Sequence, residues 1–423
     1  MSDNWKNILL PILLCVYQFG LIWGIPYLLF FVFLFDIIAP KFGYERITGC
    51  NLLVAYITQE YNNNVAFYME IDKIDFETFE QKVYQRTISS ILKMRQIPIN
   101  FLGFYLWKEV DVKLAREQVK KDDRYFKDEA SFLEYFQQIA NQRMERTKPL
   151  FEFRLVENYT GDTSMIIFRC DHAFCDGISC SGLLSTLNDD QFSIPHKKVI
   201  PKFNFFKRLT LAVNTFFGSD DINKQKQAFK TDENTKRVLK KVRNDQIKTG
   251  YFVSDIEIPY EAVRKYYKRY EGMTFNDFIL AVVGKSLHQY CIAKGIKDPK
   301  STKLTIPIGY KKLPTGYNDL SVDNYFSMID VELPLTDSVK AAFKAMKPWL
   351  SYVLQPEKQK QMINFMHISP LIPRSVMWPQ IETSSVGTHF LVSNIPFSDR
   401  PYMINGKQVR KLRFFNNIIL DTC

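Results

Sequence analysis

The sequence DHAFCDG, residues 171–177, carries the strongest fold signal, because it places an H-x-x-x-D-G motif directly after an apolar, strand-like stretch, residues 164–170. A histidine on the loop that leaves a buried strand can project its ring into a cleft, where imidazole is the usual base near neutral pH. Asp176 can fix this loop by pairing with an arginine or with backbone amides, and Gly177 permits a turn that a Cβ atom would obstruct. The motif predicts one reacting residue, His172, and two residues that hold it.

A structural histidine beside a turn could have the same sequence, so the motif alone does not distinguish a catalytic histidine from a structural one. Rival chemistries lack their companion residues, since the sequence has no G-x-S-x-G elbow, no H-E-x-x-H helix and no phosphate-binding glycine loop. Direct acyl transfer from a thioester needs only one base and a polarised carbonyl. This reaction therefore fits the sequence best.

Cysteine usage argues against a disulfide scaffold. The chain has 7 cysteines in 423 residues and no C-x-x-C pair, which is typical of reduced thiols in a cytosol-facing protein. Cys170, Cys175 and Cys180 recur every five residues around the motif, a spacing unlike that of zinc ligands. We expect small packing residues there, and neither a metal nor a bound cofactor.

Helical and strand-like patterns alternate on both sides of the motif. Helical spacing covers residues 75–94, with Asp75 as N-cap, and residues 128–143. Strands are expected at 151–156 and 164–170, joined by a turn. In the second half we expect strands at 251–258, 304–308, 326–333 and 389–392, and helices at 260–270, 274–293 and 336–354. This interleaving predicts an α/β fold.

The N-terminal region predicts a membrane anchor. Residues 7–35 contain no charged side chain, and 29 helical residues would span roughly 43 Å, more than a bilayer core of about 30 Å requires. Pro11 and Pro26 leave a single span and a re-entrant hairpin both open. The stretch is too long for the apolar core of a signal peptide, which is the alternative.

Charge and aromatic content narrow the partners. The chain has 56 basic and 45 acidic residues, a formal charge of +11, and 15% aromatic residues. Much of the excess lies in residues 197–248, within which residues 205–217 place apolar side chains at helical spacing beside lysines. This pattern fits a helix on an anionic leaflet or a linker helix on the protein core. No nucleic-acid-binding motif accompanies the charge, so a nucleic-acid partner is not expected.

Beyond the motif, four further stretches resemble one family. They are KPLFEFRLVE at 148–157, TFNDFILA at 274–281, VDNYFSMIDVEL at 322–333, and SNIP at 393–396 followed by Gly406. With the histidine motif, they resemble the wax ester synthase/diacylglycerol acyltransferase family of the CoA-dependent acyltransferase superfamily.

The resemblance implies a two-domain α/β sandwich of the chloramphenicol acetyltransferase type. The expected domains are a membrane anchor at 1–44, an N-terminal acyltransferase domain at 45–200, a basic amphipathic connector at 201–249, and a C-terminal acyltransferase domain at 250–423. His172 would lie in a channel between the two acyltransferase domains.

The resemblance also implies an activity: transfer of an acyl group from acyl-CoA, the co-substrate, to a long-chain alcohol or to diacylglycerol. His172 would be the base, with Asp176 and Gly177 in support. Asn276, Ser393 and Asn394 would orient the thioester or its oxyanion, although each could equally be a cap. Insoluble ester products imply attachment to membrane lipid, at the endoplasmic reticulum with the catalytic part facing the cytosol.

Two positions depart from the family pattern. Asp171 replaces the first histidine of the family's H-H-x-x-x-D-G, which changes the charge of the site, and Phe397 replaces a glycine, which narrows the expected channel. Two alternatives stay open, of which the first is suggested by Asp171. One is a non-catalytic lipid-binding membrane protein of the same fold, and the other is an alcohol acyltransferase for smaller acceptors.

Overall fold

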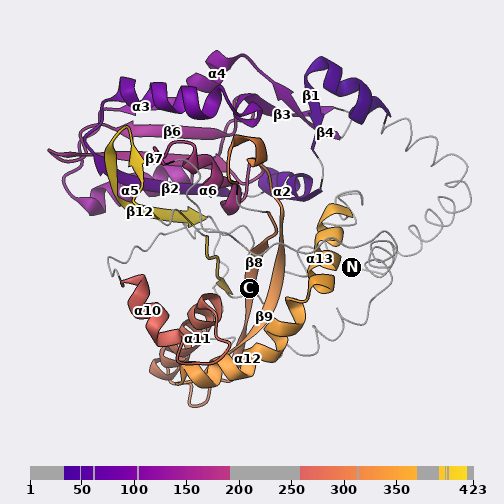
Figure 1. Ribbon diagram of the computed structural model, residues 1–423, viewed down its shortest axis with the longest axis vertical. Coiled ribbons are helices and arrows are strands. Elements are labelled where there is room, and N and C mark those ends of the chain that lie inside the picture. The colour runs from indigo at the N-terminus through magenta and orange to yellow at the C-terminus, as the bar shows by residue number, and fades with distance from the viewer. Residues whose placement is uncertain are drawn as a thin grey trace, which may run out of the picture.

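The computed structural model of the chain describes residues 33–47, 49–60, 62–101, 104–190, 258–311, 314–368, 390–395, 397 and 400–416. Figure 1 shows two parts, one from indigo to magenta above and one mainly orange below, with β8 and β9 reaching from the lower part toward the upper. Each part combines a sheet with helices, as the sequence predicts.

A six-stranded sheet forms the upper part, in the order β11-β12-β2-β7-β6-β5. Its strands are β2 (Asn64–Asp72), β5 (Val119–Asp122), β6 (Phe151–Val156), β7 (Thr163–Asp171), β11 (Met403–Ile404) and β12 (Lys407–Asn416). β6 and β7 are the predicted antiparallel hairpin, with Phe151 opposite Cys170. β2, which was not predicted, pairs with β7 along its full length.

Helices cover both faces of this sheet. One face, which includes Phe67 and Phe168, packs against α3 (Phe76–Val83) and α6 (Gly177–Ser185). The opposite face, which includes Tyr68, packs against α5 (Glu129–Ala140). β2, β6 and β7 are covered on both faces. β2 and β7 therefore contain the apolar runs VAFYM and MIIF, whereas β6 alternates apolar residues with Glu152 and Arg154.

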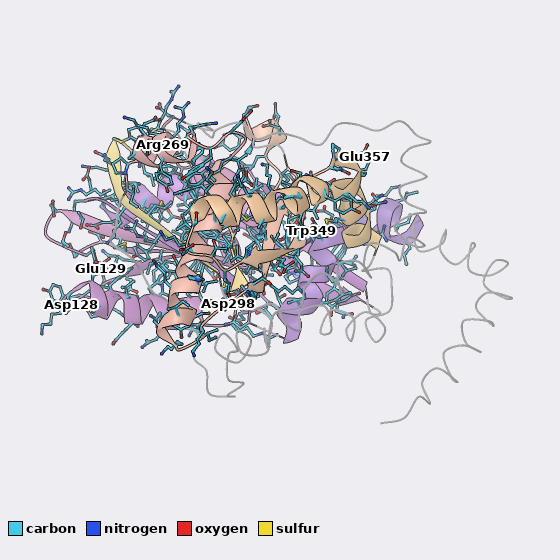
Figure 2. The ribbon with its side chains drawn as sticks, turned by 90° about the horizontal axis from the view of Figure 1, so that it is seen from below. Asp128, Glu129, Arg269, Asp298, Trp349 and Glu357 are labelled. Atoms are coloured by element: carbon cyan, nitrogen blue, oxygen red, sulfur yellow. The ribbon has the colours of Figure 1, made fainter. Side chains whose placement is uncertain are left out.

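The two predicted helices of the upper part begin where their caps indicate. Asp75 accepts a hydrogen bond from the Thr78 amide at 2.8 Å, and Asp128 caps α5 through Ser131 (Figure 2). The helix predicted for 75–94 is interrupted, because α3 continues as the single turns η3 (Tyr84–Ile88) and η4 (Leu92–Arg95). The helix prediction was therefore too long at its C-terminal end.

A smaller sheet in the order β1-β4-β3 lies beside the upper part. Its strands are β1 (Tyr44–Arg46), β3 (Gln96–Phe101) and β4 (Phe104–Glu109). The remaining elements here are η1 (Phe33–Ile38), η2 (Ala39–Phe42), α2 (Gly49–Glu60) and α4 (Val112–Arg116).

The lower part contains a sheet in the order β10-β8-β9. Its elements are α10 (Tyr260–Tyr267), α11 (Phe275–Ala293), β8 (Ser301–Gly309), β9 (Phe326–Pro334), α12 (Val339–Val353), α13 (Pro356–Ile368) and β10 (Phe390–Leu391). Between β8 and β9, η5 (Tyr317–Asp319) contacts the upper part, where Tyr317 Oη donates to the Arg86 carbonyl at 2.9 Å. Thr274 and Asp277 form a capping box at the start of α11. Trp349 of α12, labelled in Figure 2, donates from Nε1 to the Asp330 carbonyl of β9 at 3.0 Å.

The C-terminal strands return to the upper part. β12 pairs with β2, with Phe414 opposite Phe67, so the last described segment completes the first sheet. Residues 390–416 thus begin beside β8 and end in the six-stranded sheet. The domain limits at 200 and 249 lie outside the described residues and stay predictions.

The predicted membrane segment lies outside the described residues except for residues 33–35, as does the basic connector. Within the described part of the chain, no helix combines the length and the apolar character needed to span a bilayer.

Candidate active site

His172 lies on the short loop between β7 and α6. The whole of β7 is buried, and the loop is anchored by the His172 amide, which donates to the Asn63 carbonyl at 2.8 Å. The His172 side chain is itself buried, with 9% of the residue exposed, and its ring centre is 5.8 Å from that of Phe326 on β9. Ala173 packs with Val54 and Ala55 of α2. The histidine therefore lies where the two parts of the molecule meet.

Asn324 fixes the orientation of the His172 ring. Its Nδ2 donates to the His172 carbonyl at 2.8 Å and lies 3.1 Å from Oδ1 of Asn51, so its Oδ1 is the atom that faces His172 Nδ1, at 3.1 Å. An amide oxygen can only accept, so in the neutral ring Nδ1 carries the hydrogen and Nε2 has the lone pair. Among the described residues, no hydrogen-bond partner faces Nε2.

Asn51 of α2 holds Asn324 in turn. Its Oδ1 accepts from the Asn324 backbone amide at 2.7 Å as well as from the side-chain amide. Neither Asn51 nor Asn324 was assigned a role from the sequence. Asn324 does lie in the family-like stretch 322–333, which is the signal that could have found it.

Asp176 joins the histidine loop to the lower part of the molecule. One carboxylate oxygen accepts from the Ser179 amide at 2.8 Å and caps α6, while the other accepts from the Tyr325 amide at 2.9 Å. Of the two arrangements expected for Asp176, the structure shows pairing with backbone amides. The adjacent Lys311 ammonium strengthens the junction by donating to Ser179 Oγ at 2.6 Å and to the Asp323 carbonyl at 2.9 Å.

Gly177 is needed for a close approach rather than for its backbone angle. Its φ is not among the positive ones. A Cβ atom at this position would overlap the Ile395 side chain, with Cγ1 only 2.9 Å away. This corrects the expectation of a special turn. The contact also brings the segment that includes Ser393 and Asn394 to the start of α6, and Phe397 packs on the core of the upper part.

The structure brings two of the predicted oxyanion residues together. Asn394 Nδ2 donates to Asn276 Oδ1 at 2.8 Å, and both side chains are exposed, as is Ser393. The cap of α11 is Thr274, so Asn276 does not have the alternative role of N-cap. Within the described part of the chain, neither amide hydrogen-bonds to His172.

Asp171 is buried beside the histidine and supports the loop. One carboxylate oxygen accepts from the Ala173 amide at 2.8 Å, and the other lies 3.9 Å from Arg146. Burial raises the pKa of Asp171, against the opposing effects of the Ala173 amide and Arg146. The residue that departs from the family motif therefore points into its own loop.

Comparison with known proteins identifies a family that the chain resembles. The family model described as "Wax ester synthase/diacylglycerol acyltransferase catalytic domain" matches residues 128–243, a range that contains the histidine motif. Over this range the chain is similar to that catalytic domain. The predicted family resemblance is thus confirmed, and so is the prediction of an acyltransferase. No curated protein matches the chain.

Solved structures similar to this acyltransferase share its fold at low sequence identity. A trichothecene 15-O-acetyltransferase from Fusarium sporotrichioides aligns with a TM-score of 0.56 and 11% identity, covering 89% of this chain and 87% of the other. A starter condensation domain of rhizomide synthetase, in complex with C8-CoA and Leu-SNAC, gives 0.56 and 11%, covering 89% and 82%. These matches confirm the predicted CoA-dependent acyltransferase fold.

A wax ester synthase/diacylglycerol acyltransferase from Marinobacter aquaeolei VT8 also aligns. Its TM-score is 0.49 with 13% identity, covering 87% of this chain and 85% of the other.

Proposed function

We propose that this acyltransferase esterifies a long-chain alcohol, diacylglycerol or both with acyl-CoA, using His172 as general base. The observation that supports this most directly is the Asn324 contact, in which Oδ1 accepts from Nδ1–H and so favours the neutral tautomer whose lone pair is on Nε2. A base oriented in this way at a junction between two parts of the fold can meet two substrates that enter separately.

The proposed reaction uses that geometry. Nε2 takes the proton of the acceptor hydroxyl as its oxygen attacks the thioester carbonyl, and a tetrahedral oxyanion forms. The C–S bond then breaks, and the imidazolium returns the proton to the CoA thiolate, leaving ester and free CoA. Asn276 and Asn394 are the candidates for orienting the thioester or donating to the oxyanion, because their amides lie together beside the segment that touches Gly177.

The family model supports the choice of acceptors, since its description names wax esters and diacylglycerol. Acyl-CoA as donor is supported by the rhizomide synthetase domain, which has the same fold and was solved with C8-CoA. No bound cofactor is required by this mechanism, because deprotonation and leaving-group protonation use the same imidazole.

The test is ester formation by the purified full-length protein from labelled acyl-CoA with a long-chain alcohol, with diacylglycerol or with a short alcohol. We expect His172→Ala to lose at least about a hundredfold in turnover. His288→Ala is the matched control, because this half-buried histidine of α11 has no hydrogen-bond partner for Nδ1 among the described residues. No product from the wild type with any acceptor would favour a non-catalytic lipid-binding protein, and product from short alcohols alone would favour the smaller-acceptor enzyme.

The apolar segment 7–35 supports attachment to a membrane, at the endoplasmic reticulum with the catalytic part in the cytosol, where acyl-CoA is available. Removal of residues 1–32 spares every described element and should shift the protein to the soluble fraction after cell lysis. Complete retention in the membrane fraction would instead indicate the basic stretch 205–217 as the attachment.

A further inference from the structure

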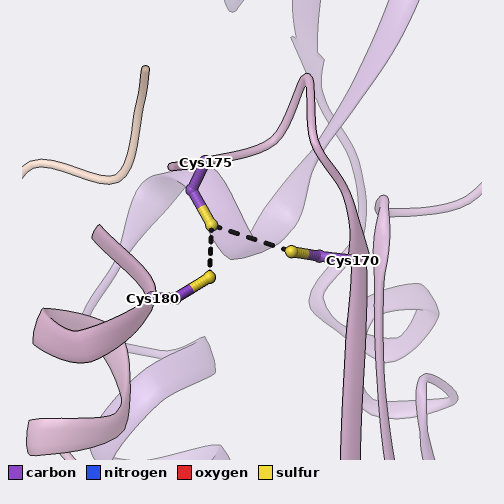
Figure 3. A group of neighbouring side chains, drawn as sticks. All are labelled: Cys170, Cys175 and Cys180. Atoms are coloured by element: carbon purple, nitrogen blue, oxygen red, sulfur yellow. Dashed lines mark hydrogen bonds between the residues drawn. The ribbon is translucent and has the colours of Figure 1, made fainter. Parts of the chain in front are cut away.

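Three cysteine thiols meet beside the histidine loop (Figure 3). Cys170 belongs to β7, Cys175 lies between His172 and Asp176, and Cys180 lies in α6. The Cys175 sulfur is 3.7 Å from that of Cys170 and 3.2 Å from that of Cys180. All three sulfurs lie within 4.8 Å of one another.

The spacing of the three cysteines in the sequence did not indicate that their thiols would meet. Ligand spacings such as C-x-x-C apply to cysteines on one turn, whereas here a strand, a loop and a helix each contribute one thiol. Because the chain reverses direction between Asp171 and Gly177, thiols five residues apart converge on one point. The sequence predicted small packing residues at these positions, and all three are buried in the core, but it did not predict that their thiols meet.

The sulfur separations suit a single metal ion. Zinc–sulfur bonds of about 2.3 Å at tetrahedral angles place ligand sulfurs about 3.8 Å apart, and trigonal coordination places them slightly further. The observed separations, from 3.2 to at most 4.8 Å, bracket these values. Shifts of well under an ångström in each side chain would complete a three-sulfur site.

The surroundings select the class of cation. All three cysteines are fully buried in the apolar core, with Phe174 and Leu183 in the same cluster. Hard cations such as Mg²⁺ and Ca²⁺ need oxygen ligands and retain water, which this core does not offer, whereas thiolates select Cu⁺ and Zn²⁺. Lys311 interacts electrostatically with Cys180, which offsets part of the negative charge of three thiolates. Lys93 contributes less, because burial lowers its pKa to about 7.

We propose that Cys170, Cys175 and Cys180 bind one soft cation of the Cu⁺/Zn²⁺ class. The ion ties the end of β7, the histidine loop and the start of α6 to one another. Its protein ligands flank His172 and Asp176 in the chain, so it would stiffen the loop that carries both. The three thiols lose their protons on binding, and the ion takes no part in electron transfer.

The experiment uses the tag-free, full-length protein, purified under reducing conditions and titrated separately with Zn²⁺, Cu⁺ and Mg²⁺ against chromophoric chelators. We expect one equivalent of Zn²⁺ or Cu⁺ to bind and to raise the unfolding temperature, and Mg²⁺ to do neither. Cys175→Ser should weaken binding by at least about tenfold, because it removes the central ligand. Cys291→Ser is the matched control, since Cys291 is also buried and lies in α11. Whichever ion binds more tightly identifies the occupant.

A wild-type measurement keeps the proposal testable if Cys175→Ser fails to fold. X-ray absorption of the loaded wild type should show three sulfur neighbours at about 2.3 Å. Four results would each overturn the proposal. The first two are a wild type that binds neither ion and an absorption spectrum that shows only nitrogen or oxygen ligands around the metal. The other two are a Cys175→Ser variant that binds as tightly as the wild type and reduced preparations that contain a Cys175–Cys180 disulfide. All these readouts are independent of ester formation, so this proposal and the proposed activity can fail separately.

Discussion

Asn324 contacts His172 at two atoms, the ring Nδ1 and the backbone carbonyl. A single amide side chain therefore fixes both the protonated nitrogen of the ring and the loop conformation below it. Asn324 is a positioning residue, because it acts through the imidazole and not on the substrate. Its side-chain hydrogen bonds disfavour a turned-over amide, because Oδ1 would then face two other acceptors, Asn51 Oδ1 and the His172 carbonyl.

Asn324→Ala should lower kcat for ester formation by about a hundredfold, because the ring loses its fixed tautomer and orientation. The KM for acyl-CoA should change little. In the His172→Ala background the same substitution should cost almost no further activity, since the residue works through that ring. Equal losses in both backgrounds would mean that Asn324 supports the fold and does not position the base.

The sequence predicted the motif residues of the site but not their partners. His172 and Asp176 could be found because strand, loop and turn residues follow one another within a few positions. Asn324 lies 152 residues further along the chain, and Asn51 comes from a helix before the first long strand. No local pattern links such segments, so only the fold brings the hydrogen-bonded partners together.

Helices and strands could be predicted from the sequence where a local pattern of apolar residues or a turn marks them. The hairpin of β6 and β7 follows from two strand-like stretches around the turn at 158–162. The helix predicted at 274–293 corresponds to α11, and the structure adds the capping box of Thr274 and Asp277. β2 was missed although it is the centre of the large sheet. Its sequence NVAFYMEID is buried on both sides, so it has no alternation to distinguish it from a helix.

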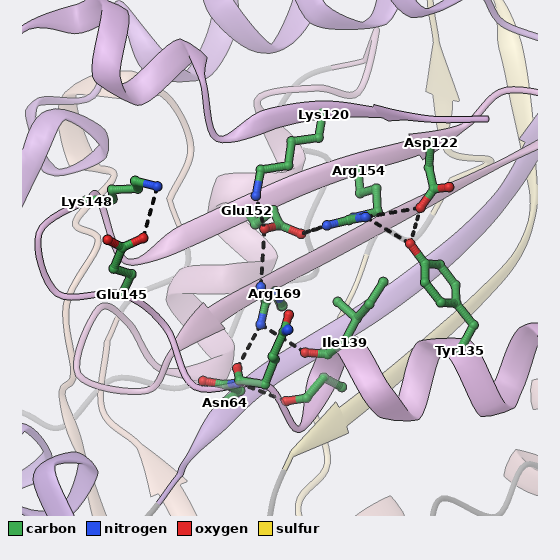
Figure 4. A network of polar contacts seen from close by, with 12 residues as sticks. Asn64, Lys120, Asp122, Tyr135, Ile139, Glu145, Lys148, Glu152, Arg154 and Arg169 are labelled. Carbon is green, nitrogen blue, oxygen red and sulfur yellow. Dashed lines mark hydrogen bonds and ion pairs between the residues drawn. The ribbon is translucent and has the colours of Figure 1, made fainter. Parts of the chain in front are cut away.

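A buried ionic network joins β5, β6 and β7 at the scale of the sheet (Figure 4). Glu152 of β6 accepts from Lys120 at 2.6 Å, from Arg154 at 2.9 Å and from Arg169 at 3.2 Å. Burial alone would raise the pKa of Glu152, but Arg169, Lys120 and Arg154 outweigh it and lower the pKa to about 2. The ionised carboxylate is therefore bound more tightly in the folded state than in the unfolded one.

The network predicts a loss of stability in acid. A carboxylate with a lowered folded pKa stabilises the protein above its unfolded pKa of about 4.3, and this contribution disappears as pH falls toward 2. At pH 7 the free energy of unfolding of the wild type should be higher than that of Glu152→Gln by about 3 kcal/mol. This difference in unfolding free energy should disappear between about pH 5 and 2. Urea unfolding at several pH values measures this. Glu134→Gln, an exposed residue of α5, is the control, and a gap that stays constant with pH would contradict the argument.

At the scale of the whole molecule, the upper and lower parts are joined by side-chain contacts and strand pairing as well as by the polypeptide chain. Asp176 binds the Tyr325 amide, Ile395 covers Gly177, and β12 pairs with β2. β12 was not predicted, because its charged sequence KQVRKLRFFN pairs with a strand more than three hundred residues earlier. The Asn405–Gly406 turn, with φ of 51° and 70°, was the local signal for the β11–β12 hairpin.

These connections predict that both parts unfold together. Phe415 of β12 packs against α5, with its ring centre 4.9 Å from that of Phe136, so Phe415→Ala should lower the unfolding free energy by about 3 kcal/mol. Hydrogen exchange should then accelerate both in residues 151–171 and in residues 326–353, although the substituted ring touches only the first part. The exposed Gln408→Ala on the same strand should leave both segments protected. If the two parts share one unfolding transition, the lost stability accelerates exchange in every segment that is protected by that transition. Faster exchange in residues 151–171 alone would therefore show that the lower part unfolds independently.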